Sequence, residues 1–267
     1  MSKIMSEKHK EFLKAVKSKN RTILATQIGL FLLVIIIWEL AAQLRLIDTF
    51  LTSSPSGIVR LLIEYTLRGS LFRHVAISVM ETVVGFLAGT ILGLLIAIGL
   101  WWSDFWYKVL DPYLVILNSL PKTALAPIII IWVGAGYSGI IVTAISISIV
   151  VTIMNISLSF RSVDEEKIRL LETFGASKTQ ILTKLILPSS VPSIISTLKV
   201  SIGLSWVGVI VGEFLVSKAG IGYLIVYGGQ VFRLDVVMMG VVVLALISAL
   251  MYKVINLVEE KFTKWIQ

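Results

Sequence analysis

The feature that most restricts the fold of this chain is a run of 38 residues, 123–160, that contains no charged side chain. One crossing of a bilayer needs about 20 apolar residues, so this run is too long for a single helix. Gly134, Gly136 and Gly139 interrupt it midway, where a break between two helices is expected. The run therefore predicts two membrane-spanning helices, the earlier one beginning near Lys108.

Four further apolar segments have the length of a membrane crossing. They are predicted at residues 22–42, from about 75 to 103 with Glu81 inside, from about 192 to 216 after a cap at Ser189 or Ser190, and at 236–258 after Asp235. The whole chain is 57% hydrophobic and 15% charged, with a mean hydropathy of +0.93. Soluble domains have about 25% charged residues, so this is an integral membrane protein. The expected fold is all-α and polytopic, with six transmembrane helices.

The distribution of Lys and Arg predicts the side on which each loop lies. Six spans place both termini on one side, and that side carries 16 Lys and Arg residues against six on the other. Cytoplasmic loops are enriched in these residues, so both termini and the loop at 161–188 are expected in the cytoplasm. The expected order is a basic cytoplasmic tail (1–21), a first transmembrane helix (22–42), an external segment (43–74), a five-helix core (75–258) and a cytoplasmic tail (259–267).

Composition excludes several kinds of chemistry. The chain has no cysteine and only two histidines, which excludes thiol catalysis and disulfides and argues against a multi-histidine metal site. No phosphate-binding loop of the form G-x-x-x-x-G-K-[ST] occurs. Paired carboxylates, or a nucleophile with a nearby base, are also not found at a spacing that suits catalysis. The net charge of +8 follows from the membrane topology and does not indicate nucleic-acid binding. We expect no catalytic residues, no cofactor and no metal. If the chain moves solute uphill, the energy comes from another subunit.

Segment 161–188 is the only long charged interruption of the hydrophobic part of the chain. Ser162 with Glu165, and Ser177 with Gln180, have the capping-box spacing, in which each side chain of the pair bonds the other's backbone N–H. Two short helices are therefore predicted, one beginning after each serine.

A glycine turn separates these two predicted helices. Gly175 stands where a helix can end in a left-handed residue, and Pro188 is expected to end the second helix because proline has no backbone N–H. Ile168, Leu171 and Phe174 share one face of the first helix, and its other faces are polar. This amphipathic hairpin is either a linker packed on its own protein or on the lipid interface, or a docking surface for another protein.

Charged residues are rare inside the predicted spans, where they usually face a partner or a water-filled path. Glu81, Lys122 and Glu213 are the clearest cases. Lys122 follows Pro121 and is either a contact of a solute path or a side chain that snorkels along its helix. Glu213, which is followed by Lys218, belongs either to a gate or to a structural ion pair.

Small residues line one face of each of two predicted spans. These residues are Gly85, Gly89 and Gly93 in the second span, and Ser201, Ser205, Gly208 and Gly212 in the fifth. Such faces let helix backbones approach closely in lipid. They predict tight packing within one subunit, with a dimer interface or a moving contact as the alternatives.

Several short motifs share their order and spacing with a known family. Gly175, Leu185, Leu187 and Pro188 fit a cytoplasmic motif of the form E-A-A, three residues, G, nine residues, I-x-L-P. The chain departs at the start, where Arg169-Leu170-Leu171 stands in place of Glu-Ala-Ala. The flanking motifs are Ser53-Ser54-Pro55-Ser56, Leu120-Pro121-Lys122 with Ala126-Pro127, Trp132-Val133-Gly134, Arg161-Ser162-Val163-Asp164, Thr173-Phe174-Gly175-Ala176-Ser177, and Gly212-Glu213 through Gly220-Ile221-Gly222-Tyr223-Leu224. Over about residues 50–258 the chain thus resembles the permease subunits of bacterial ABC importers of the nitrate, sulfonate, taurine and bicarbonate type.

This resemblance implies a type I ABC importer permease fold, with ATP hydrolysis on a separate subunit. Segment 161–188 would contain the coupling helix that docks on an ATP-binding cassette ATPase. The implied docking residues are Asp164, Glu165, Glu166, Arg169, Glu172, Phe174, Gly175, Ala176, Ser177, Leu187 and Pro188. Possible pathway residues are Pro121, Lys122 and Glu213. Two permease copies, taken as a homodimer, would form the path through the bacterial cytoplasmic membrane, and an extracytoplasmic solute-binding protein would deliver the solute.

The implied solute is a small anion such as an aliphatic sulfonate, taurine or nitrate, with which a positive Lys122 is compatible. The stretch from Pro121 to Pro127 also resembles permeases for pyrimidine-type thiamine precursors. Two other classes of function stay open. One is an ion- or proton-driven secondary transporter, which would usually contain more carboxylates in its spans. The other is a membrane scaffold whose hairpin recruits a soluble partner without transport.

Overall fold

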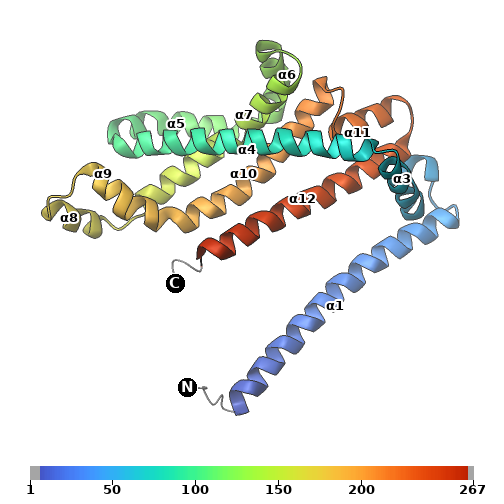
Figure 1. Cartoon of the computed structure of the whole chain (residues 1–267), viewed down its shortest axis with the longest axis horizontal. Helices are drawn as coiled ribbons and strands as arrows, with labels where there is room; N and C mark the ends of the chain where they lie inside the picture. The colour runs from blue at the N-terminus through green and yellow to red at the C-terminus, as the bar shows by residue number, and fades with distance from the viewer. Residues whose placement is uncertain (1–6, 264–267) are drawn as a thin grey trace.

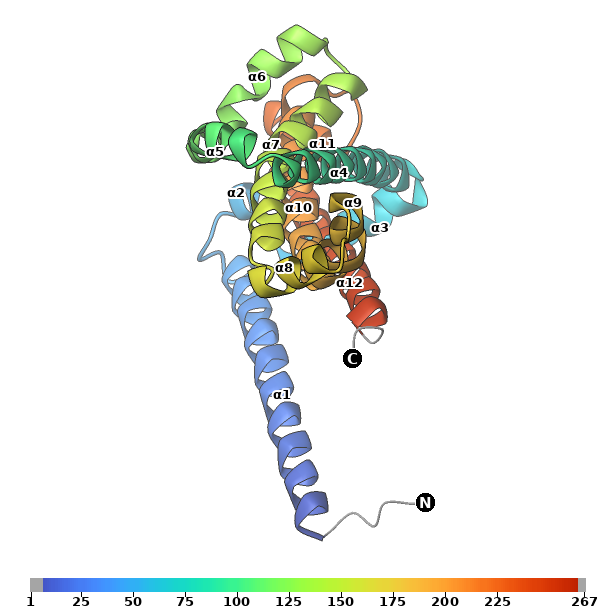
Figure 2. The same cartoon turned by 90° about the vertical axis from the view of Figure 1, so that its left-hand side faces the viewer.

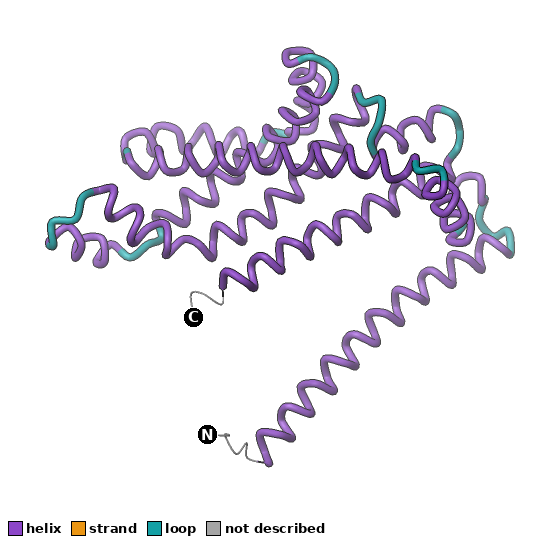
Figure 3. The backbone as a smooth tube through the Cα atoms, in the orientation of Figure 1, coloured by secondary structure: helices purple, strands orange, loops and turns teal. Residues whose placement is uncertain are grey.

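The computed structural model describes residues 7–263, and all regular structure in that range is helical. Figures 1 and 3 show a bundle of long helices with shorter ones at its ends. The elements are α1 (Glu7–Gln43), α2 (Thr49–Thr52), α3 (Pro55–Leu67), α4 (Ser70–Trp102), α5 (Asp104–Ser119), α6 (Lys122–Val133), α7 (Tyr137–Arg161), α8 (Glu165–Thr173), α9 (Lys178–Ile181), the π-helix η1 (Leu182–Ile186), α10 (Leu187–Val216), α11 (Ile221–Gln230) and α12 (Leu234–Thr263).

The number of membrane crossings agrees with the prediction from the sequence. Among the described residues, five helices are long and apolar enough to cross a membrane, and α5 with α6 make a sixth crossing if they form one bent span. The helices begin earlier than predicted: α4 begins at Ser70 instead of near residue 75, and α10 begins at Leu187 instead of near residue 192.

The third crossing is not the single helix that was predicted from Lys108 onward. α5 and α6 are separated at Leu120 and Pro121, and their axes differ by 99°. Leu120 has φ −67° and ψ 140°, an extended conformation that the ring of a following proline favours. The proline therefore turns the chain sharply at the position that precedes Lys122.

The prediction that Pro188 ends a helix is also wrong. α9, η1 and α10 form one continuous helical stretch from residue 178 to 216. Proline inside an α-helix removes a hydrogen bond and crowds the carbonyl four residues earlier. The wider π-turns of η1 lie directly before Leu187 and Pro188, where the changed bonding pattern accommodates the ring.

Helices α4, α7 and α10 form the centre of the bundle through small residues. A Cβ atom added to Gly85 would lie 2.9 Å from the Cβ of Ala144 in α7, and one added to Gly208 would lie 2.6 Å from the Cα of the same residue. Thr152 of α7 and Ser201 of α10 share a hydrogen bond of 2.8 Å. The small-residue faces thus pack within one subunit, as the sequence predicted.

A hydrophobic cluster at one end of the bundle joins α3, α10, α11 and α12. It contains Leu61 of α3, Trp206 of α10, Leu224 of α11 and Met239 of α12, all buried. We call this end the α11 end. Figure 1 shows α8 and α9 at the opposite end, which we call the α8 end. α1 ends at the α11 end and α12 begins there, so the first turns of α1 and the last turns of α12 both extend from that end toward the side of α8.

Helix α1 stands apart from the rest of the bundle, as both views show (Figures 1 and 2). No residue is buried in the most apolar 18-residue stretch of α1. Its last turns are attached through Glu39, whose carboxylate accepts hydrogen bonds from the backbone N–H of Ser56 at 2.9 Å and from its hydroxyl at 2.8 Å. The helix already begins at Glu7, so part of the segment predicted as a basic tail continues the first span.

Candidate functional site

The charged segment 161–188, hereafter the coupling segment, contains α8, α9 and η1 at the α8 end. Asp164 caps α8, and its carboxylate accepts a hydrogen bond from the N–H of Glu166 at 2.9 Å. Ser162 instead donates its hydroxyl to the carbonyl of Ser159 at 2.8 Å. The predicted Ser162–Glu165 capping box is therefore wrong, because an aspartate two residues later provides the preferred capping carboxylate.

The end of α8 has the geometry that the glycine predicted. Gly175 has φ +76°, and its N–H donates to the carbonyl of Glu172 at 2.9 Å. The N–H of Ala176 donates to the carbonyl of Leu171 at 3.0 Å. These two bonds make a Schellman motif, which satisfies carbonyl groups that the helix end would leave without partners.

The second capping box is present at the start of α9. The N–H of Ser177 donates to the side-chain oxygen of Gln180 at 2.8 Å, and the N–H of Gln180 donates to the hydroxyl of Ser177 at 3.3 Å. This reciprocal pair confirms the predicted Ser177–Gln180 box. The direction of the chain is thus set at both sides of the glycine turn.

The apolar face of α8 is narrower than predicted. Ile168 and Leu171 pack, partly buried, against a cluster that includes Phe160 and Ile186. Phe174 does not join them, because it lies at the start of the glycine turn and is 79% exposed. The other implied docking residues are mostly exposed: Asp164, Glu165, Glu166, Arg169, Glu172, Gly175, Ser177 and Pro188 are exposed, and Ala176 and Leu187 are half-buried. Helix α8 and its cap therefore present four exposed carboxylates beside the exposed Lys167 and Arg169, and Phe174 adds an exposed aromatic ring.

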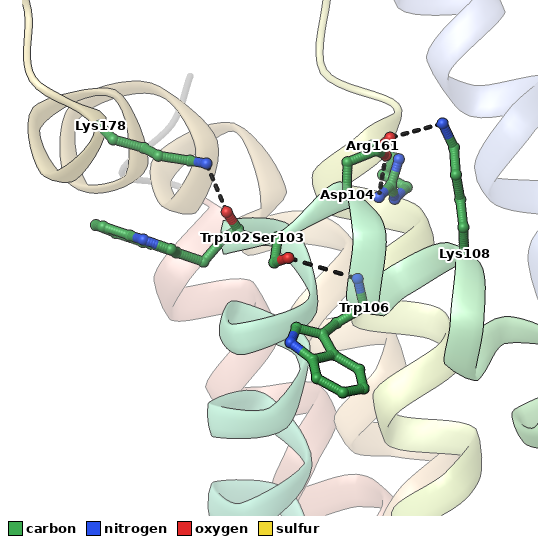
Figure 4. A network of polar contacts seen from close by, with 7 residues as sticks. All are labelled: Trp102, Ser103, Asp104, Trp106, Lys108, Arg161 and Lys178. Atoms are coloured by element: carbon green, nitrogen blue, oxygen red, sulfur yellow. Dashed lines mark hydrogen bonds and ion pairs between the residues drawn. The ribbon is translucent and has the colours of Figure 1, made fainter.

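Residues on both sides of α8 contact the short turn between α4 and α5 (Figure 4). Arg161 forms an ion pair with Asp104 at 3.0 Å, and the carbon of its guanidinium lies 3.4 Å from the centre of the Tyr107 ring. The ammonium of Lys178 donates to the backbone carbonyl of Trp102 at 2.5 Å. The sequence alone did not reveal these partners, which lie 57 and 76 residues apart along the chain.

At the α11 end, Glu213 lies in a buried polar cluster. Its carboxylate accepts hydrogen bonds from the hydroxyl of Ser78 at 2.5 Å and from the N–H of Gly222 at 2.6 Å. The N–H of Ile221 donates to the oxygen of Ser78 at 2.8 Å. Glu213 therefore caps the start of α11 and binds it to α4, where backbone N–H groups favour a negative charge. The expected alternative of an ion pair with Lys218 is not what the geometry shows.

Two further side chains complete this cluster. His74 accepts a hydrogen bond from the N–H of Gly220 at 2.9 Å. Glu81 is fully buried beside Glu213, and its carboxylate oxygens accept no hydrogen bond from the described residues. A Cβ atom on Gly222 would lie 2.8 Å from the Glu213 side chain, so the contact requires glycine. The sequence offered one signal for this site, the spacing of Glu213 from Gly220 and Gly222.

The remaining pathway candidates lie at the bend between α5 and α6. Lys122 is partly exposed at the start of α6, and its ammonium donates to the side-chain oxygen of Asn118 at 3.0 Å. No hydrogen bond or ion pair joins Lys122 to Glu213 in the described part of the chain. A separate cavity of about 410 Å³ is lined by residues that include Gly136 before α7, Tyr137 at its start, and Ser217 and Lys218 after α10.

The sequence of this chain is similar to a family of membrane transport proteins and to individual permeases within the bacteria. Residues 89–266 match the family described as "Binding-protein-dependent transport system inner membrane component". The putative aliphatic sulfonates transport permease protein SsuC of Bacillus subtilis is 32% identical over 87% of this chain and 84% of its own length. The taurine transport system permease protein TauC of Escherichia coli is 25% identical over 99% of this chain and 98% of its own.

A solved structure supports the fold independently of close sequence similarity. The chain is similar to one from the MetNI methionine ABC transporter in an inward-facing conformation, with a TM-score of 0.64 and 17% identity. The match covers 76% of this chain and 98% of the other. At this identity the match shows a shared fold.

Proposed function

This chain belongs to the family of binding-protein-dependent transport system inner membrane components, and we propose that it forms the path for a small anion through an ATP-driven importer. Family membership makes it a multi-pass inner membrane permease subunit of an ABC importer. In this family the ATPase is a separate subunit, and a binding protein brings the solute. The proposal concerns the solute, the docking surface and the subunit arrangement.

The observation that carries the docking proposal is the exposure of the coupling segment. None of the residues of α8 is buried, and the helix lies at one end of a bundle of hydrophobic helices. Its surface combines carboxylates with the ring of Phe174, which is 79% exposed. Exposed aromatic rings are common anchors in protein interfaces. The ATPase subunit is therefore proposed to bind here, with the ring of Phe174 in a pocket of its surface.

An aliphatic sulfonate or taurine is the proposed solute. The support comes from the two permeases of 32% and 25% identity, whose names state such solutes. Lys122 adds a cation at the bend between α5 and α6, where its ammonium can attract an anionic group. Pro121 and Lys122 are accordingly proposed to line the path, whereas Glu213 is proposed to fix α11 at one end of it.

A second copy of the permease and cytoplasmic termini complete the proposal. None of the residues of α5 is buried, and its large exposed side chains include Phe105, Trp106 and Ile116. Such a surface suits packing against another copy around a shared path. α1 and α12 extend toward the side of the coupling segment, which supports placing both termini on the side of the ATPase (Figure 1). The excess of Lys and Arg on that side supports the same orientation.

Reconstitution tests this proposal. The chain is co-expressed with an ATPase subunit and placed in proteoliposomes with a binding protein that binds taurine or an aliphatic sulfonate. Uptake of the labelled solute is expected only with ATP and the binding protein, and it should survive collapse of the ion gradient. Uptake without an ATPase, or uptake abolished by that collapse while ATP stays high, would contradict the proposal and favour a secondary transporter. ATP-driven uptake of a pyrimidine alone would overturn the solute but retain the transport class.

A further inference from the structure

We propose that Arg161 and Lys178, which flank α8, are positioning residues that fasten the coupling segment to the α4–α5 turn on both sides of that helix, so that movement of this segment displaces α5. The inference rests on the proposed docking of an ATPase at the coupling segment. It adds a route by which movement of the docked ATPase is transmitted to the bend at Pro121.

The first attachment lies where the chain enters the coupling segment. Arg161 is the last residue of α7, and its guanidinium holds Asp104, the first residue of α5, at 3.0 Å. The same guanidinium stacks on Tyr107 at 3.4 Å, one turn further along α5. An arginine that pairs with a carboxylate and stacks on a ring is held in position from two directions. Lys108 also pairs with Asp104, at 2.7 Å.

The second attachment lies where the chain leaves the glycine turn. The ammonium of Lys178, the first residue of α9, donates to the carbonyl of Trp102 at 2.5 Å. Trp102 is the last residue of α4, so its carbonyl is one of the groups that a helix end leaves without an intrahelical partner. A cation is favoured at this end of a helix dipole. The rings of Trp101 and Trp102 lie 5.8 and 5.6 Å from the ammonium.

The two attachments converge on one short stretch of chain, residues 102–104, although they are 17 residues apart in the sequence. Figure 4 shows Arg161 and Lys178 approaching this turn from two different helices. Between them α8 contributes only Ile168 and Leu171 to the packing against the bundle, both partly buried. A force on the exposed surface of α8 is therefore passed on at its ends and at these two side chains.

Movement of the α4–α5 turn would be passed along α5 to the bend at Pro121. α5 is a helix of 16 residues that begins at Asp104 and ends just before Leu120 and Pro121. The helix is continuous through its internal Pro112, and the sharp bend after it allows α5 to change direction relative to α6. Displacement of Asp104 therefore reaches the bend that carries Lys122.

Stability alone does not explain the arrangement. The side chains of Arg161 and Asp104 are 32% and 59% exposed, and ion pairs of this exposure contribute little to folding. Removing them should therefore leave the subunit folded and assembled. This separation between assembly and transport makes the inference testable.

The test uses the assembled importer with Arg161→Ala, Lys178→Ala and the double variant. Arg161→Lys and Lys178→Arg are the conservative variants. Arg68→Ala is the control, since it removes an arginine from an exposed ion pair with Glu64 at the α11 end. Three quantities are measured: yield of complex, ATP hydrolysis without binding protein, and solute moved per ATP hydrolysed with it.

We expect the double variant to assemble and to hydrolyse ATP, while solute moved per ATP falls by at least about fivefold, a typical size for coupling between sites. The conservative variants should recover most of that ratio, and Arg68→Ala should match the unaltered importer. An unchanged ratio in the double variant would overturn the inference, and so would loss of assembly, which would make the two cations docking or folding residues. Failure of the unaltered importer to move solute would count against the proposed function instead.

A second measurement follows α5 directly. The chain has no cysteine, so Tyr113→Cys on the exposed side of α5 introduces a single reactive thiol. Its rate of modification by a maleimide should change when ATP binds to the importer, and this change should disappear in the double variant. The same ATP-dependent change with and without the two cations would contradict the inference.

Discussion

The two ends of the molecule differ in how far water reaches their polar contacts. At the α11 end, Glu213 and Ser78 are at most 1% exposed and accept hydrogen bonds from backbone N–H groups of α11. At the α8 end, the polar contacts of Arg161, Asp104 and Lys178 are exposed to water. Buried polar groups depend on every partner, because a group left unpaired keeps its full desolvation penalty. Exposed pairs exchange their partners for water with little loss. One end is thus a fixed junction, and the other can yield to a partner without unfolding.

The largest expected effect is loss of Glu213. Glu213→Ala leaves the N–H of Gly222 and the hydroxyl of Ser78 without their shared partner and opens a cavity, so we expect a destabilisation on the order of 3 kcal/mol. Glu213→Gln, which keeps an acceptor oxygen and the volume, should lose less. Thermal unfolding in detergent measures both. Equal unfolding temperatures for Glu213→Ala and the unaltered protein would remove the distinction between the two ends.

The same substitution, glycine to alanine, can be made at each end of the molecule and its effect on stability compared. Gly222→Ala places a Cβ 2.8 Å from Glu213, so overpacking should destabilise the protein by about 1–3 kcal/mol. Gly175→Ala meets no described atom within 4 Å, and its penalty comes from φ +76° alone, about 1 kcal/mol. Chemical denaturation of both variants in the same detergent ranks them. A larger effect at Gly175 would show that the coupling segment is the more tightly packed region.

Phe174 separates stability from docking. Because its side chain is 79% exposed, Phe174→Ala should shift the free energy of unfolding by less than about 0.5 kcal/mol. If the ring anchors the ATPase, affinity for that subunit should fall at least about tenfold. Titration of the purified permease with the ATPase measures the affinity. Unchanged affinity would exclude Phe174 from the interface.

The smallest effect is expected at Arg169. Its ion pair with Glu165 spans 3.4 Å, and both side chains are more than three-quarters exposed. Arg169→Ala should therefore change the free energy of unfolding by no more than about 0.5 kcal/mol in the isolated subunit. A scan of unfolding temperature at low and high salt checks this. A marked, salt-sensitive loss would indicate that exposed pairs at the α8 end support the fold after all.

Local rules recovered much of this molecule from its sequence. Apolar length identified the spans, Gly175 identified the turn, and the Ser177–Gln180 box is present as predicted. The errors arose where neighbouring residues compete or where a distortion absorbs a local conflict. Asp164 replaced Ser162 as a cap, and η1 carried the helix through Pro188. Neither outcome follows from a single-residue preference.

The partners within the polar clusters could not be predicted in the same way. Ser78 and Glu213 are 135 residues apart, and Asp104 and Arg161 are 57 apart. Such pairs are set by how α4, α7 and α10 cross, which depends on the small residues between them. The sequence indicated that Glu213 was unusual, but only the packing of three helices showed what it binds.

The attachment of α1 bears on the order in which the protein assembles during synthesis. Glu39 and Ser56 are 17 residues apart, so their bonds can form as soon as the first span and the start of α3 have left the ribosome. The bond between Ser78 and Glu213 requires the span that contains α10, which is made much later. Contacts between distant parts of a chain generally form after local ones. Closure of the Glu213 cluster would then mark a subunit that has been made as far as α11, with only α12 still to follow.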